Sequence, residues 1–468
     1  MITTCQAGKY EGKGIVAYNF RDGWVVNPGA AEDSLEAKVP YVDNGTAQID
    51  AERFYSPEWM AREWDRLWTR VWLIAGVVSD VKEPGDYFTF DLGRENFLVT
   101  RTDSGDIKAF YNVCQHRGNR LVLNECGSVP RFTCTFHSWQ YALDGSLESV
   151  TDEDTFRPEV ICHRPNLHEV KCETRAGLIF INMDDEAGPL DDFIGLPDGY
   201  LENYHLDEMF VVRHSISEWA ANWKTGVDAF YETYHLHAVH PETQTVMNDM
   251  NVQCDLYPNG FSRMVVPLAV KSERVADQEV VDEGLQYMMQ SAGMEPAEFP
   301  GSAGEVREAI QPAKRKRAER CGLDYSDMVD SQLTDSWATG IFPNVQIGLH
   351  AEGAFLMRFM PHPTDPERFF YNTMTLWRPA NDPTYKVPDW MGLPEGTDTS
   401  GETRPEIERT GVGEPPNLGL VLDQDSRLLP VVQSGIRSRG FDGPLWSEQE
   451  QRLRHFHTEL DRYLSGEK

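Results

Sequence analysis

The pattern of hydrophobic and polar positions divides the chain into an early region of short strands and a later region in which helices alternate with a sheet. Hydrophobic runs bounded by turn residues predict strands at 71–77, 87–92, 97–100 and 107–113. Strands at this short spacing, which continue to about residue 170, are typical of a small antiparallel domain. A helix precedes them, because Ser56-Pro57-Glu58 supplies an N-cap, a helix-starting proline and an acidic first turn.

The later region combines helical and strand patterns. We expect buried strands at 178–182 and 209–216, helical periodicity at 218–240 and 272–330, three antiparallel strands between 338 and 377, and an amphipathic helix at 447–464. A sheet that carries a long helix fits an α+β domain.

The length of 468 residues exceeds one ordinary hydrophobic core, so more than one domain is expected. We predict an irregular, Gly-rich N-terminal extension (1–50), a helix that packs on the later domain (51–75), the small β domain (76–172) and the α+β domain (173–468) with a helical insertion (272–330).

The formal net charge of −32 is the unusual feature of the composition. It argues against nucleic acid as a partner, because phosphates would be repelled, and it fits either a solvated acidic surface or a partner with a basic face. The basic run at 314–317 could dock an acidic partner, but Glu319 beside it favours a solvated helix face.

The chain gives no sign of export or of a membrane span. No apolar run follows a basic start, and no segment approaches the ~20 apolar residues of a span. Outside the motifs described next, the cysteines have no framework spacing, so we expect reduced thiols and a cytoplasmic location; these residues are Cys5, Cys126, Cys162, Cys172, Cys254 and Cys321.

Two short motifs carry the strongest chemical signal. Cys114-Gln-His116 and Cys134-Thr-Phe-His137 are separated by seventeen residues, and each supplies one thiolate and one imidazole. This set suits a Rieske [2Fe–2S] centre, in which two cysteines hold one iron and two histidines hold the other. The same residue types could hold a structural zinc, but zinc fingers usually keep cysteines and histidines in separate pairs. The interleaved order therefore favours iron–sulfur.

The residues around these motifs resemble the cluster-binding loops of Rieske proteins. Ser138-Trp139-Gln140-Tyr141 and the Asp144-Gly145 hairpin turn follow the second motif. The family's usual second loop reads Cys-Pro-x-His-Gly-Trp, so Thr135 and Ser138 are departures that remove no ligand but can change the cluster potential.

A second metal site is predicted in the stretch 218–240. Asp228, Glu232 and His235 have the spacing i, i+4, i+7, which places them on one helix face, where a divalent cation would offset the cost of burying them. His240 lies five residues after His235 and returns to that side only if the helix distorts or ends, which Pro241 permits. Two imidazoles and one carboxylate form the facial triad of non-haem Fe(II) oxygenases.

Together the two motifs resemble the large (alpha) subunit of Rieske non-haem iron oxygenases, which include ring-hydroxylating dioxygenases, monooxygenases and demethylases. The resemblance implies that His235 and His240 bind a mononuclear iron, with Asp425 as the third ligand and Asp423 as the alternative. It implies that Glu232, where the family usually has Asp, bridges an iron-site histidine to a cluster histidine of the neighbouring subunit.

Further assignments accompany this set. Asp228 is a second catalytic candidate on the helix face of Glu232, and His237 is a pocket residue or, alternatively, a partner of His240 in iron binding. The apolar residues expected to line a substrate pocket are Phe230, Val239, Met247, Phe342, Val345 and Phe355.

The family resemblance also implies a fold and an activity. The fold is a small antiparallel Rieske domain plus a larger helix-grip (START-like) catalytic domain. The activity is that of a terminal oxygenase, which uses O₂ to mono- or dioxygenate an aromatic or other hydrophobic compound. The alternatives are an oxidative O- or N-demethylase, and a Rieske electron carrier fused to a ligand-binding module.

The same resemblance implies partners. The chain has no Gly-rich nucleotide fingerprint and no Cys₄ ferredoxin spacing, so a separate NAD(P)H-dependent flavin reductase or ferredoxin must supply the electrons. A homotrimer is expected, with or without a small beta subunit.

Overall fold

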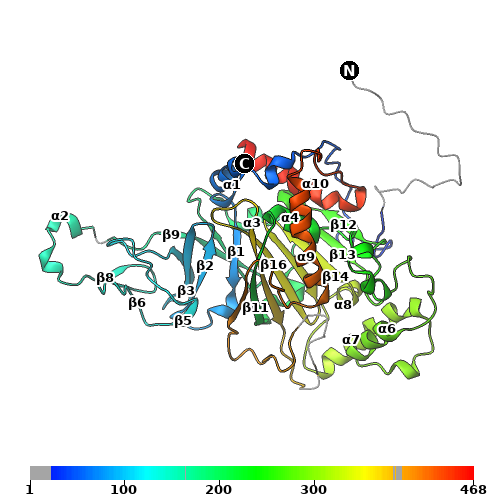
Figure 1. Cartoon of the computed structure of the whole chain (residues 1–468). Coiled ribbons are helices and arrows are strands. Elements are labelled where there is room, and N and C mark those ends of the chain that lie inside the picture. Colours follow the sequence, from blue (N-terminus) through cyan, green and yellow to red (C-terminus); the bar gives the residue numbers. More distant parts are fainter. Residues whose placement is uncertain (1–22, 164, 383–384, 386–392) are drawn as a thin grey trace.

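The molecule is built around two large sheets that lie one after the other along its length (Figure 1). The computed structural model describes residues 23–163, 165–382, 385 and 393–468. Residues 23–50 contain no helix or strand, as predicted for the extension, and Cys5 lies outside the described residues. Among the described residues, none of the helices has the length and apolar character of a membrane span.

The first sheet has seven antiparallel strands in the order β1-β10-β9-β4-β3-β2-β5. Its strands are β1 (Leu73–Val77), β2 (Asp86–Leu92), β3 (Glu95–Arg101), β4 (Ile107–Tyr111), β5 (Cys126–Ser128), β9 (Glu169–Arg175) and β10 (Leu178–Asn182). A three-stranded sheet beside it contains β6 (Phe132–Thr133), β7 (Gln140–Tyr141) and β8 (Leu147–Ser149). The predicted early strands are confirmed. Strand β10 lies outside the expected boundaries 76–172, and β1 and β9 cross them, although all three belong to the same sheet. Those domain boundaries stay a prediction.

The second sheet has eight strands in the order β12-β13-β14-β15-β16-β17-β11-β18. They are β11 (Phe210–Trp219), β12 (Gln253–Leu256), β13 (Ser262–Val266), β14 (Ser336–Ile341), β15 (Val345–His350), β16 (Gly353–Pro361), β17 (Phe369–Trp377) and β18 (Ile407–Thr410). All pairs are antiparallel except β11 with β18. The prediction of three strands between 338 and 377 was incomplete, because β14 forms a fourth strand that pairs with both β13 and β15.

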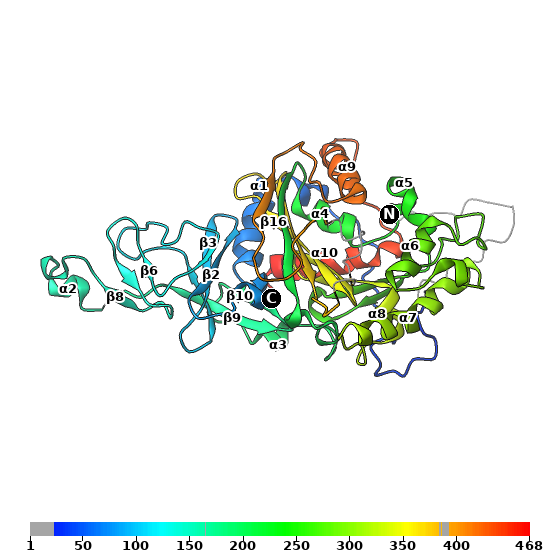
Figure 2. The same cartoon turned by 90° about the horizontal axis from the view of Figure 1, so that it is seen from below.

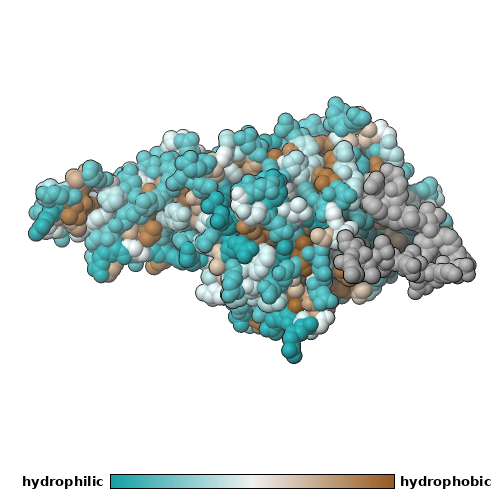
Figure 3. Space-filling model, turned by 90° about the horizontal axis from the view of Figure 1, so that it is seen from above, coloured by the Kyte–Doolittle hydropathy of each residue, from teal (hydrophilic) through white to brown (hydrophobic). Residues whose placement is uncertain are grey.

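Helices cover one face of the second sheet, as Figures 1 and 2 show for α4, α9 and α10. The helices are α1 (Pro57–Glu63), α2 (Pro158–Ile161), α3 (Leu190–Phe193), α4 (Trp223–Phe230), α5 (Leu236–Val239), α6 (Glu283–Ser291), α7 (Val306–Arg320), α8 (Asp330–Thr334), α9 (Leu420–Ile436) and α10 (Gln451–Ser465). This arrangement confirms the α+β fold class and the long C-terminal helix. Figure 3 shows one largely hydrophilic face with small hydrophobic patches, in keeping with the acidic composition.

The helical pattern expected over 218–240 is divided in the structure, and the expectation that Asp228, Glu232 and His235 share one helix face was wrong. Strand β11 continues to Trp219, α4 ends at Phe230, and only the short α5 follows. After α4, the Glu232 carboxylate accepts the backbone N–H of His235 at 3.1 Å, and the Thr233 hydroxyl donates to the Asp249 carbonyl at 3.0 Å. These side-chain bonds replace helical ones, so the candidate ligands lie on an irregular segment and not on one helix face.

The basic run 314–317 on α7 joins the helical insertion to its surroundings. Lys314 pairs with Glu352 at 2.6 Å, and Arg315 donates to the carbonyls of Tyr325 and Met328 at 2.7 Å. These contacts are internal to the chain. The prediction of a solvated helix face is therefore correct for only part of this run. The contacts of Lys314 and Arg315 within the chain explain their charges without a separate partner.

Helix α4 lies unusually close to the second sheet. A Cβ atom on Gly226 would lie 2.8 Å from Phe359 Cδ1 and 2.9 Å from Phe369 Cζ. On another side of the helix, Lys224 Nζ donates to Glu63 Oε1 at 2.5 Å and Trp223 Nε1 donates to Glu63 Oε2 at 2.8 Å. Helix α4 is therefore fixed between the sheet and α1.

We predict that Gly226→Ala lowers the free energy of unfolding by about 1–3 kcal/mol, because the added methyl overpacks the contact with two rings. Gly435→Ala on α9 is the matched control, since a Cβ there meets nothing within 4 Å, and it should stabilise the protein by about 0.5–1 kcal/mol through helix propensity. Urea denaturation measures both; equal effects would refute the close packing of α4.

Candidate metal centres

The two Cys/His motifs form a pair of similarly built loops. The Cys114 N–H donates to the Asn119 carbonyl at 2.8 Å, and the Cys134 N–H donates to the Trp139 carbonyl at 2.9 Å. Gly118 and Ser138 occupy corresponding left-handed positions, with φ of 73° and 59°. A residue with a side chain is disfavoured there by roughly 1–2 kcal/mol, so the departure at Ser138 is tolerated at the expense of local strain.

The side chains of these loops converge. The His116 and His137 ring centroids are 4.5 Å apart, and His116 stacks on the buried Trp139 at 4.7 Å. Buried Nδ1 of His116 has no hydrogen-bond partner among the described residues, a deficit that a metal ligand bond would remove. The set fits an iron–sulfur cluster.

The two thiols have different surroundings. Burial raises the pKa of Cys114, and the Tyr141 hydroxyl lies 3.5 Å from its Sγ. Burial also acts to raise the pKa of Cys134, but the backbone N–H groups of Phe136 and His137 stabilise its thiolate, so its pKa is lowered overall. Donors aimed at sulfur are the features that set the potential of an iron–sulfur cluster.

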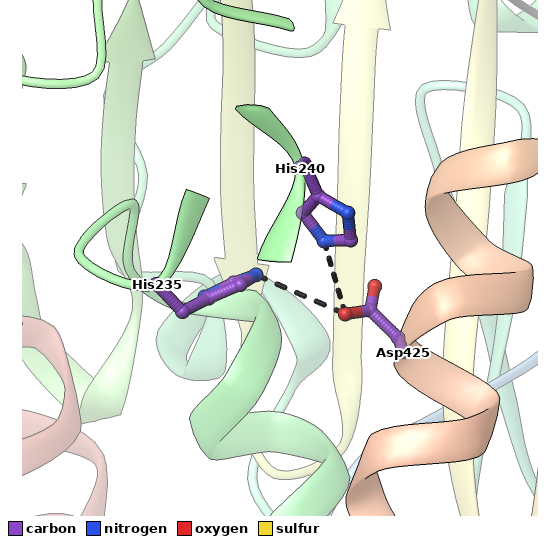
Figure 4. A group of neighbouring side chains, drawn as sticks. All are labelled: His235, His240 and Asp425. Atoms are coloured by element: carbon purple, nitrogen blue, oxygen red, sulfur yellow. Dashed lines mark hydrogen bonds and ion pairs between the residues drawn. The ribbon is translucent and has the colours of Figure 1, made fainter. Parts of the chain in front are cut away.

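The second centre is formed by His235, His240 and Asp425, drawn in Figure 4. One ligand atom from each lies within 4.8 Å of the other two. Asp425 Oδ1 on α9 is 3.0 Å from His240 Nε2 and 3.9 Å from His235 Nε2. The two imidazoles precede and follow α5. Two histidines and one carboxylate with no other described ligand form an open site suited to a divalent cation.

Each imidazole is oriented through its other nitrogen. His235 Nδ1 lies 2.5 Å from Glu232 Oε1, and His240 Nδ1 lies 2.6 Å from Gln424 Oε1. Because both acceptors are oxygens, each Nδ1 carries a proton and each Nε2 is turned toward Asp425. Burial opposes charging of His240, but the hydrogen bond and charge of Asp425 outweigh it and raise its pKa. A cation in the site would take the place of that proton.

Helix α9 is held in register by Gln433. Its Oε1 accepts the Asn222 N–H at 2.9 Å and the Thr225 hydroxyl at 3.1 Å, and its Nε2 donates to the Phe54 carbonyl at 3.0 Å. Gln433 is 3% exposed, so water cannot readily replace these hydrogen-bond partners. These bonds fix the helix that carries Asp425 against the start of α4.

The other predicted residues lie around this centre. Asp423 is not part of the convergent group, and its buried Oδ1 has no hydrogen-bond partner among the described residues. Asp228 accepts from His457 Nε2 at 3.0 Å. His237 is exposed and bonds to the Tyr234 carbonyl. The structure therefore brings Glu232 to the histidine pair, but places Asp228 with α10 and His237 at the surface.

A cavity of about 250 Å³ opens beside His235 and Asp425. Four carboxylates line it, from Asp228, Glu232, Asp425 and Glu450. The aromatic and aliphatic side chains that line it include Phe54, Leu428, Val432, Phe441, Trp446 and Leu453. None of the six apolar residues expected from the sequence lines this cavity; Phe342, for example, packs on Phe456 and Tyr463. Sequence reasoning missed Gln424, Gln433 and Glu450, whose roles depend on contacts that no spacing encodes.

Comparisons with known proteins give consistent matches. Residues 71–164 match the family described as Rieske [2Fe-2S] domain, and residues 201–466 match the family described as ring hydroxylating alpha subunit (catalytic domain). The glycine betaine monooxygenase oxygenase subunit of Pseudomonas aeruginosa is 31% identical over 43% of this chain and 44% of that protein. The biphenyl 2,3-dioxygenase alpha subunit of Rhodococcus jostii is 30% identical over 42% of this chain and 43% of that protein. The chain thus spans somewhat under half the length of these curated relatives.

Solved structures share the fold over more of the chain. A quaternary ammonium Rieske monooxygenase superposes with a TM-score of 0.63 at 18% identity, over 90% of this chain and 96% of that one. A naphthalene 1,2-dioxygenase superposes with a TM-score of 0.63 at 20% identity, over 91% and 93%. At these identities the likeness concerns the fold.

We predict that Tyr141→Phe lowers the reduction potential of the [2Fe–2S] cluster, because the variant loses the hydroxyl beside Cys114 Sγ and leaves more electron density on that sulfur. Potentiometric titration followed by EPR measures the shift. Phe132→Leu, in a neighbouring strand of the same small sheet, is the control and should keep the wild-type potential. An unchanged potential in Tyr141→Phe would show that the hydroxyl does not act on the cluster.

Proposed function

This chain belongs to the ring-hydroxylating alpha-subunit family of Rieske oxygenases, and from that premise we propose that it is the terminal oxygenase of a multicomponent system that uses O₂ to oxidise an organic substrate. The convergence of His235, His240 and Asp425 beside a cavity is the observation that carries the proposal. A Rieske electron carrier fused to a binding module would have no reason to assemble this open ligand set.

The family has two iron cofactors, a Rieske [2Fe–2S] cluster and a mononuclear iron. We assign Cys114, His116, Cys134 and His137 to the cluster, and His235, His240 and Asp425 to the iron. When bound, the cluster supplies single electrons and the iron supplies a centre where O₂ can be activated. The sequence contains no Gly-rich nucleotide fingerprint, so we propose a separate reductase or ferredoxin as the electron source.

The chain's own residues prepare the iron site. Glu232 and Gln424 hold the Nδ1 protons of His235 and His240, which leaves each Nε2 available as a ligand. The carboxylate of Asp425 completes the set from α9. The cavity beside it, lined mainly by apolar side chains, would hold the substrate and limit the access of water.

We propose a homotrimer as the active form. The cluster loops, beside β6 and β7, and the iron site, between α5 and α9, lie in different parts of one chain (Figures 1 and 2). A head-to-tail ring would bring the cluster loops of one copy to Glu232 of the next. Exposed apolar side chains on both surfaces support this contact: Leu123 and Phe136 near the cluster, and Leu428, Val431 and Val432 on α9. A small beta subunit is compatible with the ring.

The substrate is an organic compound, and two classes are supported. Mono- or dioxygenation of an aromatic or other hydrophobic compound fits the apolar lining and the dioxygenase relatives. Oxidative demethylation of a quaternary ammonium compound is favoured by the glycine betaine and carnitine monooxygenase relatives and by the four carboxylates at the cavity, which would attract a cation. We propose a cytoplasmic location, in keeping with the free thiols of the described cysteines.

Product analysis tests the function. The purified protein, with a surrogate reductase and ferredoxin, is offered aromatic, steroid-like and methylated ammonium substrates, with ¹⁸O₂ as the oxidant. We expect ¹⁸O in a hydroxylated product, or formaldehyde from a demethylated one. Reduction and reoxidation of the cluster without substrate oxidation across the panel would support the carrier alternative.

We predict that Asp425→Ala loses the mononuclear iron and all turnover while it keeps the cluster, because the two ligand sets are separate. Asp423→Ala is the matched control, one helical turn away or less, and should keep iron and activity. Metal analysis and EPR of the reduced cluster measure both variants. The reverse pattern would transfer the ligand role to Asp423.

We predict that Glu232→Gln keeps both metal sites and the trimer but reoxidises its reduced cluster at least about tenfold more slowly in single turnover, because the charged acceptor beside His235 is lost. Stopped-flow absorbance with substrate and O₂ gives the rate. Asp228→Asn is the control for loss of one carboxylate at the same cavity. Wild-type rates in Glu232→Gln, or full activity of a monomer, would contradict the bridging role.

A further inference from the structure

A second, larger cavity lies between the two sheets and shares no lining residue with the cavity beside the iron ligands. Its volume is about 1050 Å³, and its walls come from β2 and β5 of the first sheet, from β11, β16 and β17 of the second, and from residues 401–409. Neither the cluster ligands nor the iron ligands line it. Two neighbouring guanidiniums line one end of it, from the buried Arg358 and the partly exposed Arg404.

Arg358 is the most buried of these cations. It is 2% exposed and lies at the floor on β16. Its Nη1 donates to the carbonyls of Ile74 and Ala75 at 3.2 and 2.6 Å, where a bulge interrupts the pairing of β1, and its Nη2 donates to Asn372 Oδ1 at 3.0 Å. The Nε atom is buried and has no hydrogen-bond partner among the described residues. Arg358 makes no ion pair within the described residues.

Arg404 lies beside it. Arg404 Nε pairs with Asp80 Oδ1 at 2.6 Å, and Nη2 lies 3.1 Å from His214 Nδ1, while Nη1 is buried without a partner among the described residues. The hydroxyl of Ser79, next to Asp80, is likewise buried and unpartnered there. Three donors at this end of the cavity therefore have no acceptor among the described residues, and Asp80 Oδ1, although ion-paired with Arg404, accepts no hydrogen bond from them either.

The charges at this floor do not balance. Burial and the nearby Arg404 lower the pKa of Arg358 to about 9, so the guanidinium is still charged at neutral pH. Burial and Arg404 hold the pKa of His214 well below its usual range, so that imidazole is neutral. Asp80 is the one carboxylate in range of Arg358, and it already pairs with Arg404. Arg358 is 2% exposed and Arg404 is 25% exposed, so two guanidiniums against one carboxylate leave a partly buried surplus of positive charge, which an anion would offset.

The other residues that line the cavity indicate which class of anion it would bind. Apolar side chains border the same space, among them Phe210, Met360 and Phe370. The exposed carboxylates of Asp91, Glu402 and Glu406 line the mouth and would repel a multiply charged anion. A single carboxylate on an apolar body satisfies both conditions.

We propose that this cavity is a second ligand site, separate from the iron site, which binds an organic monocarboxylate with its carboxylate between Arg358 and Arg404. The bound carboxylate would accept hydrogen bonds from Arg358 Nε, Arg404 Nη1 and Ser79, after small side-chain adjustments that expose these atoms. Because Arg358 reaches β1 and Arg404 reaches Asp80, the ligand joins the first sheet to the second and stabilises their contact.

The test uses the full chain with benzoate as the probe, and inorganic phosphate and benzyl alcohol as comparison ligands. We expect near-saturating benzoate to raise Tm by about 2–4 °C and to slow hydrogen exchange at 74–80 and 401–410, whereas phosphate and benzyl alcohol do neither. Arg404→Gln should lose both effects. Arg409→Gln removes a guanidinium that pairs with Glu125 at the rim, and it should keep both effects.

Several results would overturn the site. Protection confined to the segments around the iron ligands would show that benzoate binds only there. Equal responses to phosphate would refute a site for monocarboxylates, and an undiminished Tm shift in Arg404→Gln would refute the role of the cation pair. Exchange in the wild-type protein locates the ligand without any variant, so a variant that fails to fold does not decide the outcome.

Discussion

The register of α9 against α4 is the constraint on which the candidate iron site depends. Asp425 and the two histidines are 185 residues or more apart in sequence, and only the placement of α9 brings the carboxylate to 3.0 Å from His240. The amide of Gln433 sets that placement through three buried hydrogen bonds to Asn222, Thr225 and Phe54. A slip of α9 would leave these groups unpaired, at about 1–3 kcal/mol each, so the helix has one favoured position.

The electrostatics of the site follow from that placement. Asp228, Glu232, Asp425 and Glu450 gather around one cavity, and burial, aided by the nearby carboxylates of Glu232 and Asp228, raises the pKa of Glu450. The imidazole that faces Asp228 gives little compensation, because burial and Arg53 hold the pKa of His457 well below its usual range. The region therefore favours cations. A divalent metal would neutralise part of the negative charge of these carboxylates, and a cationic substrate would neutralise more of it.

Much of the fold was predictable from the sequence, because alternating hydrophobic residues and turn signals act locally. The early strands and the C-terminal helix belong to this class. The break after Phe230 was not predictable, since it depends on Thr233 bonding to Asp249 and on the Glu232 carboxylate capping the His235 N–H. Strand β14 was also missed because it depends on non-local contacts, namely its pairing with β13 and β15.

Some residues of the candidate site were likewise predictable from the sequence, and others were not. Residue type and spacing single out the two Cys/His motifs and the histidine pair. Spacing alone leaves Asp423 and Asp425 as alternatives, and the side that each takes on α9 distinguishes them in space. Gln433 and the left-handed Ser138 gave no sequence signal, because one acts across 211 residues and the other through a backbone angle.

Metal content distinguishes a two-centre oxygenase from its alternatives. We predict three irons and two acid-labile sulfides per chain in the purified protein, with no stoichiometric zinc: two irons in the cluster and one at His235, His240 and Asp425. Two irons and two sulfides, with nothing at the second centre after anaerobic Fe(II) reconstitution, would contradict this prediction and identify an electron carrier. Zinc without sulfide would contradict the cluster itself.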